Sequence, residues 1–72
     1  MLEQDIGESL RQRRKVLKIT QSHLAELAGV SANTLYKIER GQVNPTVGIV
    51  QKIAEVLGME IIIRVKQQKF ET

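Results

Sequence analysis

Four polar side chains fall at helical spacing in the middle of the chain: Asn33, Tyr36, Lys37 and Arg40. On a helix whose inward direction is Leu35, Asn33 and Lys37 point almost the opposite way, and the other two lie on one flank. An asparagine amide can make paired contacts with an adenine edge, a lysine can donate to guanine N7 and O6, and the methyl group of Ala32 can meet a thymine methyl. These residue types favour contact with base edges. For Tyr36, a phosphate contact or simple exposure are the alternatives.

A second group of residues is better suited to phosphate oxygens. Thr20 and Gln21 begin a helix, where free backbone N–H groups and the positive end of the helix dipole favour an anion. Thr34 lies on the margin of the next helix and can reach a phosphate or merely cover the turn. Arg40 and Gln42, near the end of that helix, are weaker phosphate candidates. For Gln21 the alternative is an ordinary polar residue in a first helical turn.

Hydrophobic periodicity and capping residues predict four helices that position these side chains, at about residues 2–17, 21–28, 32–40 and 46–57. The residues predicted to face inward on the first helix are Ile6, Leu10 and Leu17. On the second helix they are Leu24, Ala25, Leu27 and Ala28. On the fourth they are Val47, Val50, Ile53, Ala54 and Leu57.

The second and third predicted helices are separated by the three residues Gly29, Val30 and Ser31. Glycine can take the left-handed conformation of a tight turn, and serine can cap the helix that follows. Two helices joined in this way make a helix-turn-helix, whose second helix can lie in a DNA major groove. Many helical hairpins share this spacing, so the spacing alone leaves DNA binding open.

Composition limits the other classes of function. The chain has 72 residues, no cysteine and a single histidine, so we expect one small domain without disulfides and without a metal site. No apolar run approaches membrane-spanning length and no export signal is evident, which predicts a cytoplasmic protein without membrane contact. Motifs for phosphate loops, paired carboxylates and nucleophiles are missing, so we expect no catalytic residues, no cofactor and no enzymatic activity.

The formal net charge is +3, and basic residues gather between residues 11 and 18. Such a run is either a solvated helix face or a patch for phosphates. We expect Arg11, Arg13, Lys15 and Lys18 to be mostly solvated, and no individual contact is assigned to them.

Residues 59–66 change the pattern from helical to alternating, with Met59, Ile61, Ile63 and Val65 on one face. A single strand is not stable in water, so the simplest mate is the same strand of a second copy. We therefore expect a homodimer in which this strand pairs antiparallel across a twofold axis, followed by a tail at residues 67–72. The dimer could present two copies of the third helix roughly 34 Å apart and read an inverted repeat. A fifth helix is the alternative.

Residues 20–45, TQSHLAELAGVSANTLYKIERGQVNP, resemble the Cro/repressor type of helix-turn-helix, the Xre family. The resemblance extends backward to Gly7, Leu10 and Arg14 and forward to Leu57 and Gly58. It implies a mainly α, four-helix, lambda-repressor-like DNA-binding domain at residues 1–58, with one C-terminal strand in this chain. It also implies a dimeric transcriptional repressor, with base readout at Ala32, Asn33 and Lys37 and a phosphate clamp at Gln21.

Glu39 is the one charged residue expected on the inward side of the third helix, about 40° from Leu35 on the wheel. A buried charge needs a partner, and Arg14, at the border of the first helix's apolar stripe, can supply it. The family resemblance likewise implies an Arg14–Glu39 ion pair. Its role would be to fix the first helix against the third.

A terminal strand in place of a fifth helix is similar to the HipB-like antitoxins, which repress their own operon and hold a HipA-type kinase toxin inactive. This resemblance implies an autoregulating antitoxin with a kinase toxin as partner. Two alternatives stay open: a stand-alone phage-type or bacterial transcriptional regulator, and a protein-interaction module that does not bind DNA. The exposed polar face of Asn33, Lys37 and Gln21 argues against the last alternative.

Overall fold

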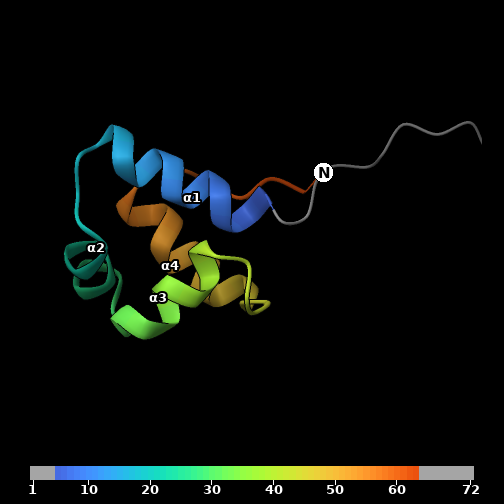
Figure 1. Cartoon of the computed structure of the whole chain (residues 1–72). Coiled ribbons are helices and arrows are strands. Elements are labelled where there is room, and N and C mark those ends of the chain that lie inside the picture. The colour runs from blue at the N-terminus through green and yellow to red at the C-terminus, as the bar shows by residue number, and fades with distance from the viewer. Residues whose placement is uncertain (1–4, 64–72) are drawn as a thin grey trace, which may run out of the picture.

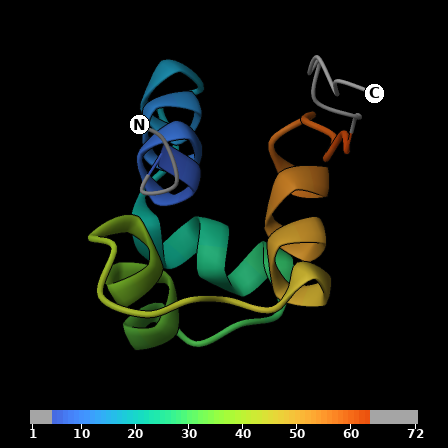
Figure 2. The same ribbon diagram turned by 90° about the vertical axis from the view of Figure 1, so that its right-hand side faces the viewer.

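The computed structural model describes residues 5–63, and these residues form four helices. The helices are α1 (Asp5–Val16), α2 (Gln21–Ala28), α3 (Ala32–Glu39) and α4 (Val47–Val56). Figure 1 shows α1 along the upper side of the molecule and α3 along the lower side. In the perpendicular view of Figure 2, α2 spans the space between α1 and α4. The mainly helical, four-helix fold predicted from the sequence is confirmed.

Hydroxyl side chains define where three of the helices begin. Thr20 and Ser31 each accept a hydrogen bond from the backbone N–H three residues further on, at 3.0 Å in both cases. Thr46 does the same for α4 at 3.2 Å. The first N–H groups of a helix have no partner within it, so these caps stabilise the starting points. Gly29 ends α2 in the left-handed conformation, with a φ of 73°.

The core lies where the four helices meet. Its largest fully buried side chains are Leu24, Leu35, Ile38, Ile53 and Leu57, and Leu10 of α1 joins the same cluster. Pairwise, α2 packs against α3 and α4, and α1 packs against α3. Each buried side chain of this size contributes about 1.5–3 kcal/mol relative to exposure. Helices of 8 to 12 residues are marginal in isolation, so this packing holds them.

Gly7 allows α1 to approach α3 closely. A Cβ atom added at Gly7 would fall on the backbone carbonyl oxygen of Ile38 and lie 3.2 Å from the Cα atom of Glu39. The contact is therefore between two backbones, and only a residue without a side chain fits there.

Some apolar residues predicted to face the core lie at the surface instead: Ile6, Leu17, Leu27 and Val47. Leu17 follows the last residue of α1 and is outside the helix. Around the axis of α2, Leu27 lies about 60° from Leu24 in one direction, whereas the buried Ala25 and Ala28 lie from Leu24 in the other direction. The other two lie in the first turns of α1 and α4, beyond the rim of the core.

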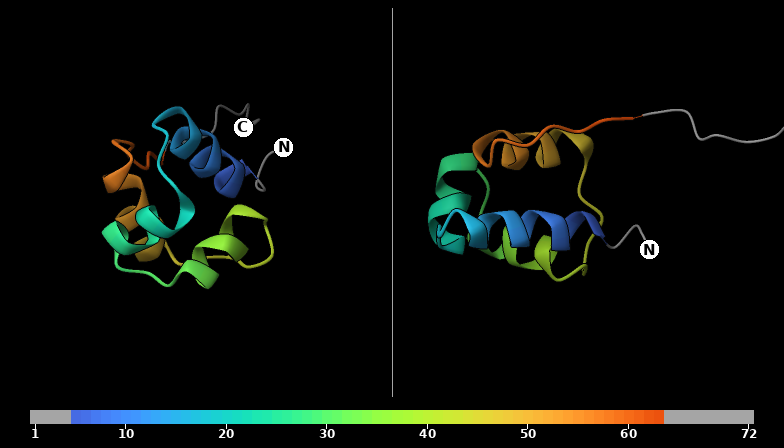
Figure 3. Two further views of the ribbon diagram at one scale, coloured as in Figure 1. Left: turned by 60° about the vertical axis from the view of Figure 1, so that its left-hand side comes forward. Right: turned by 90° about the horizontal axis from the view of Figure 1, so that it is seen from above.

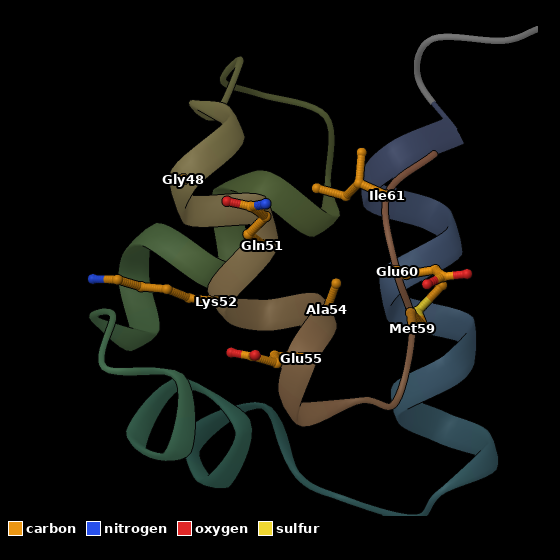
Figure 4. Close-up of a pocket in the computed structure, with 8 residues that line it drawn as sticks. All are labelled: Gly48, Gln51, Lys52, Ala54, Glu55, Met59, Glu60 and Ile61. Atoms are coloured by element: carbon orange, nitrogen blue, oxygen red, sulfur yellow. The ribbon is translucent and has the colours of Figure 1, made fainter. Parts of the chain in front are cut away.

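After Gly58 the chain turns back, and residues 59–63 run along α4 without regular secondary structure, as the right-hand view of Figure 3 shows. Figure 4 shows Met59, Glu60 and Ile61 on this segment, where they line a surface hollow together with residues of α4. The Met59 N–H donates to the Ala54 carbonyl oxygen at 2.8 Å, and the Met59 side chain packs on the core. Of the predicted strand, residues 64–66 with Val65, like the tail 67–72, lie outside the described residues. Strand pairing between two copies stays a prediction, because a strand with its mate in a second copy forms no ladder within one chain.

Candidate nucleic-acid interface

The outer face of α3 carries the side chains that the sequence predicted to contact bases. Ala32, Asn33, Tyr36 and Lys37 are all exposed, whereas Leu35 and Ile38 on the opposite face are at most 2% exposed. In Figure 1 α3 lies along the lower edge of the molecule, with no other helix below it. These polar groups and the Ala32 methyl group are therefore accessible to a ligand that approaches α3 from outside.

Arg40, the residue that ends α3, stacks on Tyr36. The central carbon of its guanidinium group lies 5.2 Å from the centre of the Tyr36 ring. A cation over an aromatic face is stabilised by about 0.5–1 kcal/mol at an exposed site. The ring therefore restricts the directions in which Arg40 can point, while the guanidinium N–H groups remain free to donate.

Glu39 is buried behind this face and joins three parts of the chain. Its Oε2 accepts from Arg14 Nε at 2.9 Å, and its Oε1 accepts from Arg14 Nη2 at 3.0 Å. The same Oε1 accepts from Gln21 Nε2 at 2.9 Å. Arg14 also donates from Nη1 to the Ile19 carbonyl oxygen at 2.9 Å. The end of α3 is thereby connected to α1 and to the first residue of α2.

The Arg14–Glu39 contact has the two-pronged geometry that makes guanidinium–carboxylate pairs strong. Glu39 is only 5% exposed. The hydrogen bond to Glu39 raises the pKa of Arg14 above its usual value, and this outweighs the opposite effect of burial. Arg14 therefore stays charged, and the ion pair fixes α1 against α3.

The candidate phosphate contacts lie at the start of α2, in the first turn of α3 and just after the end of α3. The Thr20 hydroxyl oxygen accepts from the His23 N–H, which leaves the hydroxyl proton free to donate. Thr34 is half-buried, and its hydroxyl oxygen accepts from the Ser31 hydroxyl at 2.8 Å. The Gln42 N–H is taken up by the Lys37 carbonyl oxygen at 2.9 Å, so only the exposed Gln42 side chain is available.

The charge around α3 is one-sided. From residue 29 to residue 54 the sequence contains a single acidic residue, Glu39, and that carboxylate is buried and paired. The cations of the same stretch, Lys37, Arg40 and Lys52, are all exposed. The outer face and the end of α3 therefore carry the cations Lys37 and Arg40 and no exposed carboxylate of their own, which favours a polyanion.

Sequence reasoning missed two features that position the interface. Arg13, expected to be solvated, donates from Nε to the Leu57 carbonyl oxygen at 2.9 Å and so holds the end of α4 to α1. Gly7 permits the α1–α3 contact; this glycine belongs to the family resemblance, but no role was predicted for it. Neither contact could be predicted from one sequence, because the partner in each case is a backbone group far away along the chain.

Within residues 5–63 no helix is long and apolar enough to cross a membrane. The same residues contain no group of three His, Cys, Asp or Glu side chains placed to hold a metal ion.

Comparison with known proteins identifies relatives of most of the chain. A family model described as helix-turn-helix matches residues 10–62. An HTH-type transcriptional regulatory protein of Methanococcus maripaludis is 41% identical over 56 residues, which are 78% of this chain and 17% of that protein. An HTH-type transcriptional regulator of Methanothermobacter thermautotrophicus is 40% identical over 53 residues, which are 74% of this chain and 77% of the relative.

The immunity repressor protein of Bacillus phage phi105 is 36% identical over 56 residues, covering 78% of this chain and 39% of that protein. The chain thus spans most of the Methanothermobacter relative but a small part of the Methanococcus one. Among solved structures, the restriction-modification controller protein C.AhdI from Aeromonas hydrophila superposes with a TM-score of 0.74 at 32% identity. The match covers 78% of this chain and 85% of that chain.

Proposed function

The chain belongs to the helix-turn-helix family, and we propose that it binds double-stranded DNA sequence-specifically and represses transcription. In this proposal α3 enters the major groove, where Asn33, Lys37 and Ala32 contact base edges and Tyr36 lies beside them. The phosphates on either side are bound by a second set of side chains: Thr20, Gln21, Thr34, Arg40 and Gln42.

One observation carries this proposal. The face of α3 that points away from the core is polar and cationic, and the only carboxylate of that helix is turned inward and neutralised by Arg14. An exposed glutamate on this helix would repel phosphates, so its removal from the surface favours DNA as the ligand. The named functions of the relatives, HTH-type regulators, a phage immunity repressor and a controller protein, support the same role.

We further propose that the chain acts as a homodimer on an inverted-repeat operator. The support is the apolar surface that follows α4: Ile61, Ile62 and Ile63 are all exposed in the single chain, the last by 88%. Pairing this segment with the same segment of a second copy would cover it and satisfy its backbone N–H and C=O groups. A twofold axis there would relate two α3 helices, as an inverted repeat requires.

The finer biological role that we propose is that of a HipB-like antitoxin, which represses its own operon and inhibits a HipA-type kinase toxin. It rests on the family resemblance through the C-terminal segment. A stand-alone phage-type or bacterial regulator is the second candidate, favoured by the similarity to the phage immunity repressor. Co-purification of the chain with a kinase encoded by the neighbouring gene would decide for the antitoxin, and absence of such a complex would decide for the stand-alone regulator.

The DNA-binding proposal is tested by selecting duplexes from a random library with the full chain and then measuring affinities by fluorescence anisotropy. Lys37→Ala should weaken binding to the selected site by about 1–3 kcal/mol and relax preference at one base pair. Lys52→Ala removes an equal charge from α4 and serves as the matched control, with the base preference unchanged. An equal loss for Lys37→Ala on selected and random duplexes would contradict the base-reading role of Lys37.

A further inference from the structure

The first residue of α2 and the last residue of α3 are joined by a side-chain hydrogen bond, Gln21 Nε2 to Glu39 Oε1. A carboxylate can only accept hydrogen bonds, so the Gln21 amide must turn its nitrogen toward Glu39. This bond takes up one of the two N–H groups of the amide. The other N–H and the amide oxygen remain available to a ligand at the start of α2.

Glu39 is a fixed acceptor. Both of its oxygens are bound by Arg14, at 2.9 and 3.0 Å, and its side chain is 1% exposed. A carboxylate held at both oxygens in the core cannot rotate without breaking charge-assisted bonds. The position of the Gln21 amide is therefore set by α3, the helix proposed to read the bases, and by α1 through Arg14.

We propose that Glu39 is a positioning residue for DNA binding that acts through Gln21. The inference rests on the proposed function, in which Gln21 contacts a phosphate. Glu39 orders the glutamine side chain before DNA arrives, so that the remaining N–H meets the phosphate without a further loss of rotamer freedom. Glu39 is part of α3 and binds the Gln21 amide, so the distance between α3 and the proposed phosphate contact of Gln21 stays constant.

A double-mutant cycle on the full chain tests this coupling, with affinity for a selected duplex measured below the unfolding temperature of every variant. Gln21→Ala and Glu39→Met, which removes the acceptor of the Gln21 amide while keeping a side chain of similar volume, should each lower affinity by about tenfold or more, the loss expected for a hydrogen bond to a charged group. The double variant should lie within about twofold of either single variant, because both changes remove the same contact.

Two controls separate positioning from stability. Arg14→Lys weakens the same ion pair but keeps a cation beside Glu39 and the carboxylate as acceptor for Gln21, so the folded variant should bind more tightly than Glu39→Met while its unfolding temperature falls. Thr34→Ala changes a different proposed phosphate contact, so its effect should multiply with that of Glu39→Met.

The proposal is overturned if the losses from Gln21→Ala and Glu39→Met multiply, or if Arg14→Lys reduces affinity as much as Glu39→Met. If Glu39→Met does not fold, hydrogen exchange of the Gln21 side-chain amide in the unaltered chain decides instead. Exchange slower than that of the exposed Gln51 amide would support the positioning role, and equal exchange would refute it. Absence of sequence-preferring binding by the unaltered chain would refute the proposed function itself, independently of the cycle.

Discussion

Replacing Gly7 with alanine should destabilise the protein, although the same change in most helices does the reverse. Alanine is favoured over glycine inside a helix by about 0.5–1 kcal/mol, because glycine loses more backbone freedom on folding. Gly7 lies in the first turn of α1, and a Cβ atom there would overlap the carbonyl oxygen of Ile38. This oxygen belongs to the α3 backbone and cannot rotate away, so α1 would have to move away from α3.

The expected size follows from these opposing effects. Overpacking a well-packed contact costs about 1–3 kcal/mol, and a clash with backbone lies toward the upper end. After subtraction of the helix-propensity gain, Gly7→Ala should lower the free energy of unfolding by about 2 kcal/mol. For a domain of this size that corresponds to a fall in Tm of roughly 8–16 °C.

The assay is thermal unfolding followed by circular dichroism, at one protein concentration because the proposed dimer would make Tm concentration-dependent. Gly48→Ala is the matched control, since Gly48 also lies in a helix but a Cβ atom there meets nothing closer than the Thr46 hydroxyl oxygen at 3.9 Å. Its Tm should rise slightly or stay unchanged. A Tm for Gly7→Ala at or above that of the wild-type chain would refute the reasoning about the α1–α3 contact.

Three further outcomes are expected. Glu39→Ala leaves a half-buried arginine without its partner and should cost about 3–5 kcal/mol in urea unfolding; a loss below about 1 kcal/mol would contradict a structural ion pair. Tyr36→Phe keeps the ring under Arg40 and should bind DNA like wild type, whereas Tyr36→Ala should lose about twofold to fivefold; equal losses would point to the hydroxyl group instead. Ile63→Lys should convert a dimer into a monomer in light scattering while the exposed control Val16→Lys does not, and a dimeric Ile63→Lys chain would argue against strand pairing.

The helices and turns were predictable because their signals are local. Thr20 and Ser31 cap helices within three residues of themselves, and Gly29 adopts the left-handed φ that the turn between α2 and α3 requires. Wheel positions also placed Asn33 and Lys37 outside and Leu35 inside, since successive side chains of a helix are separated by a constant angle.

The apolar pattern was less reliable at helix ends. Leu27 and Val47 belong to the apolar stripes predicted on a helical wheel, but both side chains are exposed in the structure. Which part of a stripe becomes buried depends on where the next helix crosses it, and one sequence does not contain that crossing point.

The sequence by itself determined the order of elements, the caps, the turn and the exposed face of α3, because each depends on residues within a few positions of one another. The tertiary structure alone decided that Gly7 meets the backbone of α3, that Arg13 holds the Leu57 carbonyl and that Gln21 shares an oxygen of Glu39 with Arg14. These contacts join residues 18 to 44 positions apart, so they exist only when packing brings the helices together. The physical reason is that hydrogen bonds and steric contacts act over a few ångströms in space, whatever the separation along the chain.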